Sequence, residues 1–268
     1  MIKNVLTIGG SDASGGAGIQ ADLKTFSAIG VYGMSVITAL TAQNTTGVYS
    51  AHTPPVDFLQ DQIDRVFEDI PPAALKIGML SNAEVIKGVV NSLRKYDCPH
   101  VILDPVMVSS TGHSLLDPEA IEILRDVLLP MTTMITPNLT EIACLLDTSL
   151  PASREEMVAA AQALQNYSCN HVLLKGGHLR DSGSPDLLLT ENGEQHWFET
   201  SRIDTKNTHG TGCTLSASIV SFLATNGGDV LDAVTKAKGF VTQAIKYSDL
   251  LNVGKGAGPT HHFATIWP

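Results

Sequence analysis

Asn207-Thr208-His209-Gly210-Thr211-Gly212-Cys213-Thr214-Leu215 is a glycine loop that leads directly into a helical pattern of apolar residues. Glycine lets the backbone turn its N–H groups inward at places where a Cβ would obstruct them. The first N–H groups of a helix also have no partner inside the helix. We therefore expect Gly210, Thr211 and Gly212 to form a pocket of donors at the positive end of a helix dipole, which suits a transferring phosphate.

Cys213 follows the second glycine and is expected in the first turn of this helix. A helix N-terminus lowers the pKa of a cysteine thiol, so the thiolate could act as a base or a nucleophile. The alternative is a tight turn before a buried helix, with Cys213 as a small core residue. Because Gly-x-Gly is frequent by chance, the rest of the chain has to decide between these interpretations.

The composition limits the classes of partner. The chain has 268 residues, 43% of them hydrophobic, and a net charge of −10 from 17 basic and 27 acidic residues. Such a surface does not attract nucleic acid or an anionic membrane. No apolar stretch approaches the roughly 20 residues that span a bilayer, and the N-terminal apolar run is too short for a signal peptide. The four cysteines contain no CxxC pair, which favours a reducing, cytoplasmic location over a disulfide framework or a zinc site.

Strand-like apolar runs alternate with helical patterns through most of the chain. The expected strands cover residues 5–8, 36–40, 75–80, 101–103, 134–136 and 172–174, and Asn192-Gly193 predicts a hairpin between 187–189 and 196–198. Alternation of this kind predicts an α/β fold with a mainly parallel central sheet and helices on both faces. We expect one domain over residues 1–268, with a tail that lacks a clear pattern after about residue 263.

Polar side chains follow several of the predicted strands. They are Gln43, Asp104, Asn138 with Glu141, and Lys175. Ligands bind at the carboxyl ends of the strands in such sheets, so we expect these side chains at one edge. Carboxylates, a lysine and an anion-binding loop are the groups used in phosphoryl transfer with a metal ion. Each residue taken alone could instead be an ordinary strand end, helix cap or solvated loop residue.

Other nucleotide-binding motifs are absent or weak. The only Gly-Lys pair is Gly254-Lys255, followed by Gly256, so the chain has no P-loop. Gly16-Ala17-Gly18-Ile19-Gln20-Ala21 matches the loose dinucleotide pattern, but no acidic residue lies between Asp22 and Asp57 to bind the ribose. An NAD site is therefore poorly supported.

Five segments together closely resemble the hydroxymethylpyrimidine/phosphomethylpyrimidine kinases of thiamine biosynthesis, within the ribokinase-like superfamily. They are Ile8-Gly9-Gly10-Ser11-Asp12-Ala13-Ser14-Gly15-Gly16-Ala17-Gly18-Ile19-Gln20-Ala21-Asp22, Asp104-Pro105-Val106-Met107, Thr136-Pro137-Asn138-Leu139-Thr140-Glu141, Lys175-Gly176-Gly177-His178 and His209-Gly210-Thr211-Gly212-Cys213-Thr214. The resemblance runs from about residue 4 to about residue 263. It implies a single ribokinase-like α/β domain, usually a homodimer, that uses Mg²⁺ and ATP. The substrate would be 4-amino-5-hydroxymethyl-2-methylpyrimidine, phosphorylated first to the monophosphate and then to the diphosphate.

The resemblance also implies roles for individual residues. Gly210, Thr211 and Gly212 would form the anion hole, with Cys213 as the base. Asn138, Lys175 and Asp104 would bind the nucleotide phosphates. Glu141 and Asp104 would bind the metal ion. The implied pyrimidine-binding residues are Gln43, which would read the ring edge, Met79 and Val106, which would pack on the ring, and Gly10 and Ala17 in the loop that closes the pocket.

Three alternatives stay open. Pyridoxal kinase activity, alone or in addition, is the nearest, because pyridoxal is also a flat heteroaromatic ring with a hydroxymethyl group. A cysteine-dependent hydrolase or acyl transferase would pair Cys213 with His113, His178 or His209. A non-catalytic nucleotide-binding regulator is the third.

Overall fold

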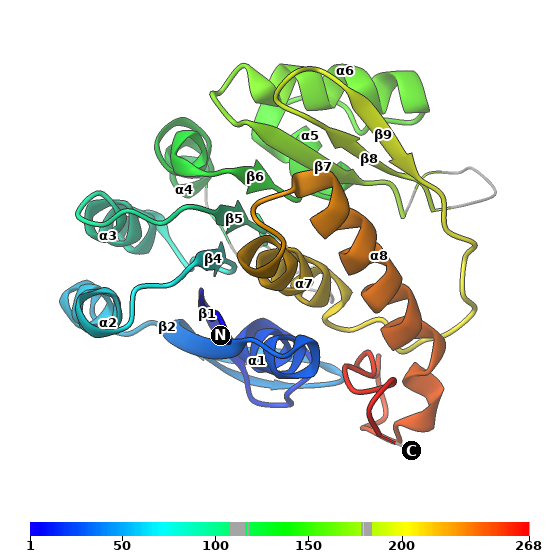
Figure 1. The fold of residues 1–268 in the computed structure, drawn as a ribbon, viewed down its shortest axis with the longest axis horizontal. Coiled ribbons are helices and arrows are strands. Elements are labelled where there is room, and N and C mark those ends of the chain that lie inside the picture. Colours follow the sequence, from blue (N-terminus) through cyan, green and yellow to red (C-terminus); the bar gives the residue numbers. More distant parts are fainter. Residues whose placement is uncertain (108–115, 117, 178, 180–183, 268) are drawn as a thin grey trace.

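The structure is a computed structural model that describes residues 1–107, 116, 118–177, 179 and 184–267. Nine strands in this part of the chain form one sheet, in the order β3-β2-β1-β4-β5-β6-β7-β8-β9 (Figure 1). The strands from β2 to β7 in this order are parallel, and antiparallel strands complete both edges. The strands are β1 (Asn4–Asp12), β2 (Tyr32–Asn44), β3 (Gly47–His52), β4 (Ala74–Ile77), β5 (Val101–Leu103), β6 (Met134–Ile135), β7 (His171–Lys175), β8 (Asp186–Leu189) and β9 (Gln195–Phe198).

Helices cover both faces of the sheet (Figure 1). They are α1 (Gly18–Ile29), α2 (Val56–Asp69), α3 (Ala83–Leu93), α4 (Pro118–Ile123), α5 (Leu139–Leu146), α6 (Arg154–Gln165), α7 (Thr211–Thr225) and α8 (Val230–Lys246). Side chains of each strand alternate between the two faces, as the period of two requires. In β5, Val101 and Leu103 join the core beneath α2 to α6, and Ile102 joins the core beneath α1, α7 and α8.

The predicted fold class is confirmed, with differences at the edges of the sheet. The expected strand over 36–40 extends through Asn44, because β3 pairs with its end after a turn. The sequence did not predict β3 or α6. β3 is largely exposed and carries no apolar run, and α6 buries only Met157, Ala161 and Leu164. Asn192-Gly193 does lie between two antiparallel strands, with Gly193 at φ +79°, as predicted.

The C-terminal segment packs against the start of α7. The backbone N–H of His209 donates to Gly258 O at 3.0 Å, and that of Thr260 donates to His209 O at 3.3 Å. Residues 263–267, expected to lack a clear pattern, form turns in which the rings of Phe263 and Trp267 stack at 4.5 Å.

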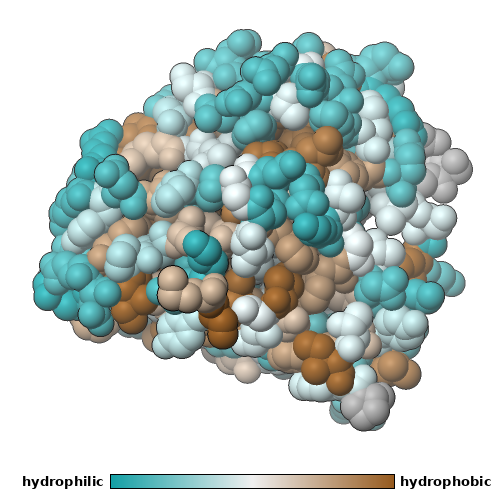
Figure 2. Space-filling model, viewed as in Figure 1, coloured by the Kyte–Doolittle hydropathy of each residue, from teal (hydrophilic) through white to brown (hydrophobic). Residues whose placement is uncertain are grey.

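Hydrophilic residues cover most of the upper part of the visible surface, and hydrophobic residues form separate groups, most of them in its lower half (Figure 2). Over the residues that the structure describes, no helix has both the length and the apolar character needed to cross a membrane.

Candidate active site

Asp104, Glu141 and Lys175 meet at the carboxyl edge of the parallel strands. Asp104 directly follows β5, Lys175 ends β7, and Glu141 lies in the first turn of α5. Lys175 Nζ is 3.1 Å from Asp104 Oδ1 and 3.9 Å from Glu141 Oε2. One ammonium group therefore lies between two carboxylates that come from sequence positions 37 residues apart (141 − 104).

Asp104 is buried and ionised. Its carboxylate accepts hydrogen bonds from Thr136 Oγ1 at 3.2 Å and from Ser216 Oγ at 3.1 Å. Burial by itself would raise the pKa of Asp104, but the nearby ammonium groups of Lys175 and Lys76 outweigh it and hold the pKa below its usual range. Nothing in the sequence indicated the parts played by Thr136 and Ser216.

Glu141 and Asn138 form a reciprocal cap on α5. Asn138 Oδ1 accepts from the Glu141 backbone N–H at 2.8 Å, and Glu141 Oε2 accepts from the Asn138 backbone N–H at 2.7 Å. Burial raises the pKa of Glu141 to about 7; Lys175 opposes this rise and Asp104 adds to it. The carboxylate is therefore both a helix cap and a group whose charge responds to a nearby cation.

The glycine loop brings the start of α7 to this cluster. Gly210 caps the helix at φ +79°, and a Cβ there would overlap the carbonyl oxygen of Gly16. A Cβ on Gly212 would lie 3.4 Å from Lys175 Nζ and 3.7 Å from Asp104 Oδ2. The first turn of α7 thus begins beside the lysine and the carboxylate. The Thr211 backbone N–H itself donates to Thr208 O at 3.2 Å.

Cys213 is half-buried in the first turn of α7, as predicted, but its acidity differs from the prediction. Burial raises the pKa of its thiol to about 11; Lys76 lowers it, Asp22 and Asp104 raise it, and the Gly18 backbone N–H lowers it by a hydrogen bond. The expectation of a lowered pKa was therefore wrong, because loss of solvent outweighs the helix N-terminus here.

Gln43 lies within β2 rather than after it, near the glycine loop. Its Nε2 is 3.4 Å from His209 Nε2, and its Oε1 accepts from Thr41 Oγ1 at 3.2 Å. His209 Nε2 is also 2.8 Å from Asp12 Oδ2. Neither Asp12 nor His209 was assigned this contact from the sequence.

The other predicted substrate residues lie around the ends of β1, β4 and β5. The Ala17 backbone N–H donates to Asp12 Oδ2 at 2.8 Å. A Cβ on Gly10 would lie 3.1 Å from Met79 Sδ, so these two residues are neighbours. The Val106 backbone N–H donates to Asp104 O at 2.8 Å, which holds Val106 next to the carboxylate cluster.

The geometry gives no support to a cysteine hydrolase. His209 uses Nε2 toward Asp12, and no imidazole of the described residues hydrogen-bonds to Cys213. The other two histidines considered for this role, His113 and His178, lie outside the described residues.

Asp104 and Glu141 are suitable ligands for a hard cation, but they do not form a complete site. No group of three His, Cys, Asp or Glu side chains in the described part of the chain could hold a metal ion. Mg²⁺ commonly takes one or two carboxylates and completes its shell with water and substrate phosphates. The donor set therefore fits Mg²⁺ that arrives with a nucleotide.

A model of the phosphomethylpyrimidine kinase family matches residues 12–261. The chain belongs to this family. It is 50% identical to the hydroxymethylpyrimidine/phosphomethylpyrimidine kinase of Salmonella typhimurium and 49% identical to that of Escherichia coli, each over 264 residues and 98% of both chains. The protein is thus a phosphotransferase.

Solved structures with the same fold include both kinds of vitamin kinase. The phosphomethylpyrimidine kinase of Clostridium difficile has a TM-score of 0.81 at 44% identity, over 92% of this chain and 100% of the other. The ADP complex of Bacillus subtilis pyridoxal kinase has a TM-score of 0.91 at 34% identity, over 100% of both chains. The fold is therefore the ribokinase-like α/β fold expected from the sequence.

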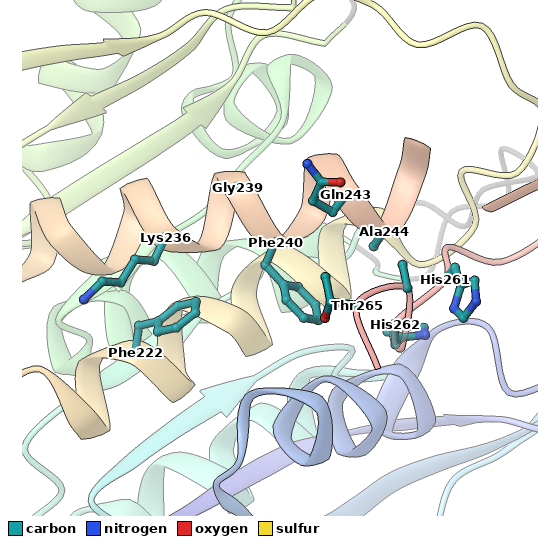
Figure 3. A pocket seen from close by; sticks show the side chains of 10 residues that line it. Phe222, Lys236, Gly239, Phe240, Gln243, Ala244, His261, His262 and Thr265 are labelled. Carbon is teal, nitrogen blue, oxygen red and sulfur yellow. The ribbon is translucent and has the colours of Figure 1, made fainter. Parts of the chain in front are cut away.

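A separate groove of about 320 Å³ lies between α7, α8 and the C-terminal segment (Figure 3). It contains none of the predicted site residues. Its lining consists of Phe222, Lys236, Gly239, Phe240, Gln243, Ala244, His261, His262, Ala264 and Thr265.

Proposed function

We propose that this kinase phosphorylates 4-amino-5-hydroxymethyl-2-methylpyrimidine with ATP, first at the hydroxymethyl group and then at the resulting phosphate. These are the two phosphorylations of the pyrimidine in thiamine biosynthesis. The observation that carries the proposal is the closeness of the start of α7 to the Asp104–Lys175 pair. A Cβ added at Gly212 would lie only 3.4 Å from Lys175 Nζ. Relatives of that name match nearly the whole chain.

The proposed roles follow from charge and position. Gly210 and Gly212 offer backbone donors to the transferred phosphoryl group, beside Thr211, whose own N–H donates to Thr208 O. Lys175 neutralises charge on the nucleotide phosphates. Asp104 and Glu141 hold Mg²⁺, which supplies further charge stabilisation on the phosphate oxygens. Asn138 fixes the Glu141 carboxylate through their reciprocal hydrogen bonds.

The residues proposed to bind the pyrimidine are Gln43, Gly10, Ala17, Met79 and Val106. The amide of Gln43 has a donor and an acceptor for the edge of an aminopyrimidine ring. Met79 supplies a polarisable surface for the ring face. The loop that includes Ala17 is held by Asp12, so it presents backbone groups in a fixed arrangement.

Cys213 is proposed as the base in the first phosphorylation only. Because burial raises its pKa to about 11, Cys213 is almost entirely the neutral thiol near neutral pH. Phosphoryl transfer has a loose transition state, so alignment and charge stabilisation contribute more than the base. The second nucleophile is already an anionic phosphate and needs no base.

The deciding experiment incubates the protein with the hydroxymethylpyrimidine and Mg-ATP and identifies mono- and diphosphate by mass. Diphosphate formation supports the proposal. Monophosphate alone would reduce the function to a single-step kinase, and absence of both products would show that the acceptor is wrong.

Pyridoxal kinase activity is the second candidate, favoured by the fold similarity to Bacillus subtilis pyridoxal kinase. Parallel kcat/KM measurements with pyridoxal and the pyrimidine decide between the two. A kcat/KM for pyridoxal equal to or above that for the pyrimidine would overturn the preference for the pyrimidine.

We also propose that the protein is a cytoplasmic homodimer. The four cysteines are free thiols, which favours a reducing compartment. The dimer rests on the resemblance to the family, and sedimentation equilibrium tests it: a mass near 28.4 kDa rather than twice that value would contradict it.

A further inference from the structure

The side-chain amide of Gln43 has a polar neighbour at each of its two ends. Its Nε2 lies 3.4 Å from His209 Nε2, and its Oε1 lies 3.2 Å from Thr41 Oγ1. The nitrogen and oxygen ends of an amide have nearly the same size and shape, so the hydrogens of its neighbours decide which end faces which. What Gln43 offers to a ligand therefore depends on His209 and Thr41.

The Asp12 carboxylate fixes a hydrogen on Nε2 of His209. Asp12 Oδ2 lies 2.8 Å from this nitrogen and also accepts from the backbone N–H groups of Gly16 at 3.1 Å and Ala17 at 2.8 Å. Burial would raise the pKa of Asp12, but its hydrogen bonds, led by that from His209, outweigh burial and hold the pKa below its usual range. An ionised carboxylate only accepts, so Nε2 carries the hydrogen in both the neutral and the charged imidazole. This nitrogen then has no lone pair for the NH₂ group of Gln43.

The Thr41 hydroxyl leads to the same conclusion at the other end of the amide. Its oxygen lies 2.8 Å from Ser11 O and 3.2 Å from Gln43 Oε1. A hydroxyl has one hydrogen and a backbone carbonyl can only accept, so the hydrogen goes to the nearer Ser11 O. Two acceptors then face each other at Thr41, and two donors face each other at His209. Turning the amide by 180° removes both conflicts, because Nε2 then donates to Thr41 Oγ1 and Oε1 faces the His209 N–H.

The turned amide presents a defined pattern to a bound ring. One carbonyl lone pair of Gln43 remains free on the His209 side, and one N–H remains free on the Thr41 side. A 4-aminopyrimidine pairs with this pattern when its amino group faces Oε1 and the neighbouring ring nitrogen faces Nε2. The 5-hydroxymethyl group is next to the amino group, so it then lies on the side of His209, whose next residue is Gly210 of the glycine loop. The opposite orientation of the amide would place it on the Thr41 side instead.

We propose that Asp12 and His209 determine specificity by holding the Gln43 carbonyl oxygen toward His209, so that the site takes 4-aminopyrimidines and rejects their 4-oxo counterparts. Both act through Gln43 and are positioning residues, and their bearing on the substrate rests on the proposed role of Gln43. A 4-oxopyrimidine carries a carbonyl oxygen beside a ring N–H, which opposes acceptor to acceptor and donor to donor. Sites whose own polar groups would be left unpaired discriminate strongly against such a ligand.

His209→Leu tests the proposal, because it removes the N–H that excludes the NH₂ end of the amide. Asp12 keeps its four hydrogen bonds from the loop 14–17, so we expect the variant to fold, which its melting temperature checks. His209→Gln is the rescue variant, since its amide has two hydrogens, one for Asp12 and one for Gln43. Val106→Ala is the matched control, because a smaller contact with the ring face should weaken both kinds of ring equally.

The first readout is a neutron crystal structure of the wild-type protein after exchange into deuterium. It locates these hydrogens directly and requires neither substrate nor activity. We expect deuterium on His209 Nε2 and the ND₂ group of Gln43 on the Thr41 side. An ND₂ group that faces His209 overturns the proposal.

The second readout compares 5-hydroxymethyl-2-methylpyrimidin-4-one with 4-amino-5-hydroxymethyl-2-methylpyrimidine, as the ratio of their dissociation constants measured by calorimetry without ATP. We expect a ratio of about 100 or more in the wild type. The ratio should fall about tenfold or more in His209→Leu, where the amide can turn over, and stay within about threefold of the wild type in His209→Gln and Val106→Ala.

The two readouts separate this proposal from the proposed function. A wild-type ratio below about ten, or an unchanged ratio in folded His209→Leu, overturns the selectivity assigned to Asp12 and His209 and leaves the kinase function standing. If neither ring binds although the deuterium lies as expected, the arrangement of the amide is supported and the proposed function is refuted instead.

Discussion

Replacement of Gly212 by alanine should separate activity from stability. The added Cβ would lie 3.4 Å from Lys175 Nζ and 3.7 Å from Asp104 Oδ2, which are ordinary contact distances. Gly212 is the second residue of α7 and does not have a positive φ, so alanine should stabilise the helix by up to about 1 kcal/mol. The same methyl group would occupy space that we assign to the transferred phosphoryl group.

The expected loss of activity follows from the proposed anion hole. Gly212→Ala keeps its backbone N–H, but its methyl group would hold the phosphoryl group away from the donors. Loss of one oxyanion-hole donor typically costs about 10²–10³ in kcat, or roughly 3–4 kcal/mol. We expect a loss of this size in Gly212→Ala, measured as ATP-dependent pyrimidine phosphorylation, together with an equal or higher melting temperature. Gly239→Ala is the control, because it adds a methyl group to α8 with nothing within 4 Å and should leave activity unchanged.

Gly210→Ala provides the opposite pattern. Its φ of +79° and the overlap with Gly16 O would force the loop to move, so stability and activity should fall together. Activity of Gly212→Ala within tenfold of the wild type would refute the assignment of the anion hole. A melting temperature several degrees lower for Gly212→Ala would refute the claim that its methyl group fits the fold.

Three further predictions concern charge. Burial holds the pKa of His262 at about 4, below its ordinary 6.5. The protein therefore has its full free energy of unfolding above pH 6.5, and this free energy falls as the pH decreases toward 4, because the unfolded chain takes up the proton first. Between pH 7 and pH 5, the free energy of unfolding measured in urea should therefore fall by about 2 kcal/mol less for His262→Gln than for the wild type. Equal falls in the two proteins would contradict this prediction. Lys175→Met leaves Asp104 and Glu141 without the ammonium between them, so kcat/KM for ATP should fall about 100-fold or more, while the surface variant Lys87→Met should match the wild type. Cys213→Ala should slow monophosphate formation more than diphosphate formation, and an equal loss in both steps would remove its role as base.

The sequence correctly predicted the part of the site that depends only on the direction of the strands. Asp104 and Lys175 each follow a short apolar run, and parallel strands bring their carboxyl ends to one edge, so the meeting of these residues could be expected without coordinates. The sheet edge was harder to predict, because β3 lies exposed and has no apolar pattern. Gln43 was consequently expected after a strand and lies within one.

The acidity of Cys213 could not be predicted, because local and tertiary effects oppose each other. The helix N-terminus is visible in the sequence, and it favours the thiolate. Burial and the carboxylates of Asp22 and Asp104 come from segments far away in the chain, and they favour the thiol. Lys76, which lowers the pKa of the thiol, lies within the short strand 74–77, and its own partner Asp22 is 54 residues away in the chain.

The start of α7 is held by both ends of the chain, which bears on how the proposed anion hole can work. Gly210 touches the loop after β1, His209 pairs in backbone hydrogen bonds with the C-terminal segment, and Thr214 Oγ1 lies 3.1 Å from His262 Nε2. Donors fixed in this way before a ligand binds need no reorganisation during the reaction, which is the condition under which backbone N–H groups stabilise developing charge most effectively. The C-terminal segment therefore contributes to the geometry of a phosphate site that none of its own residues need contact.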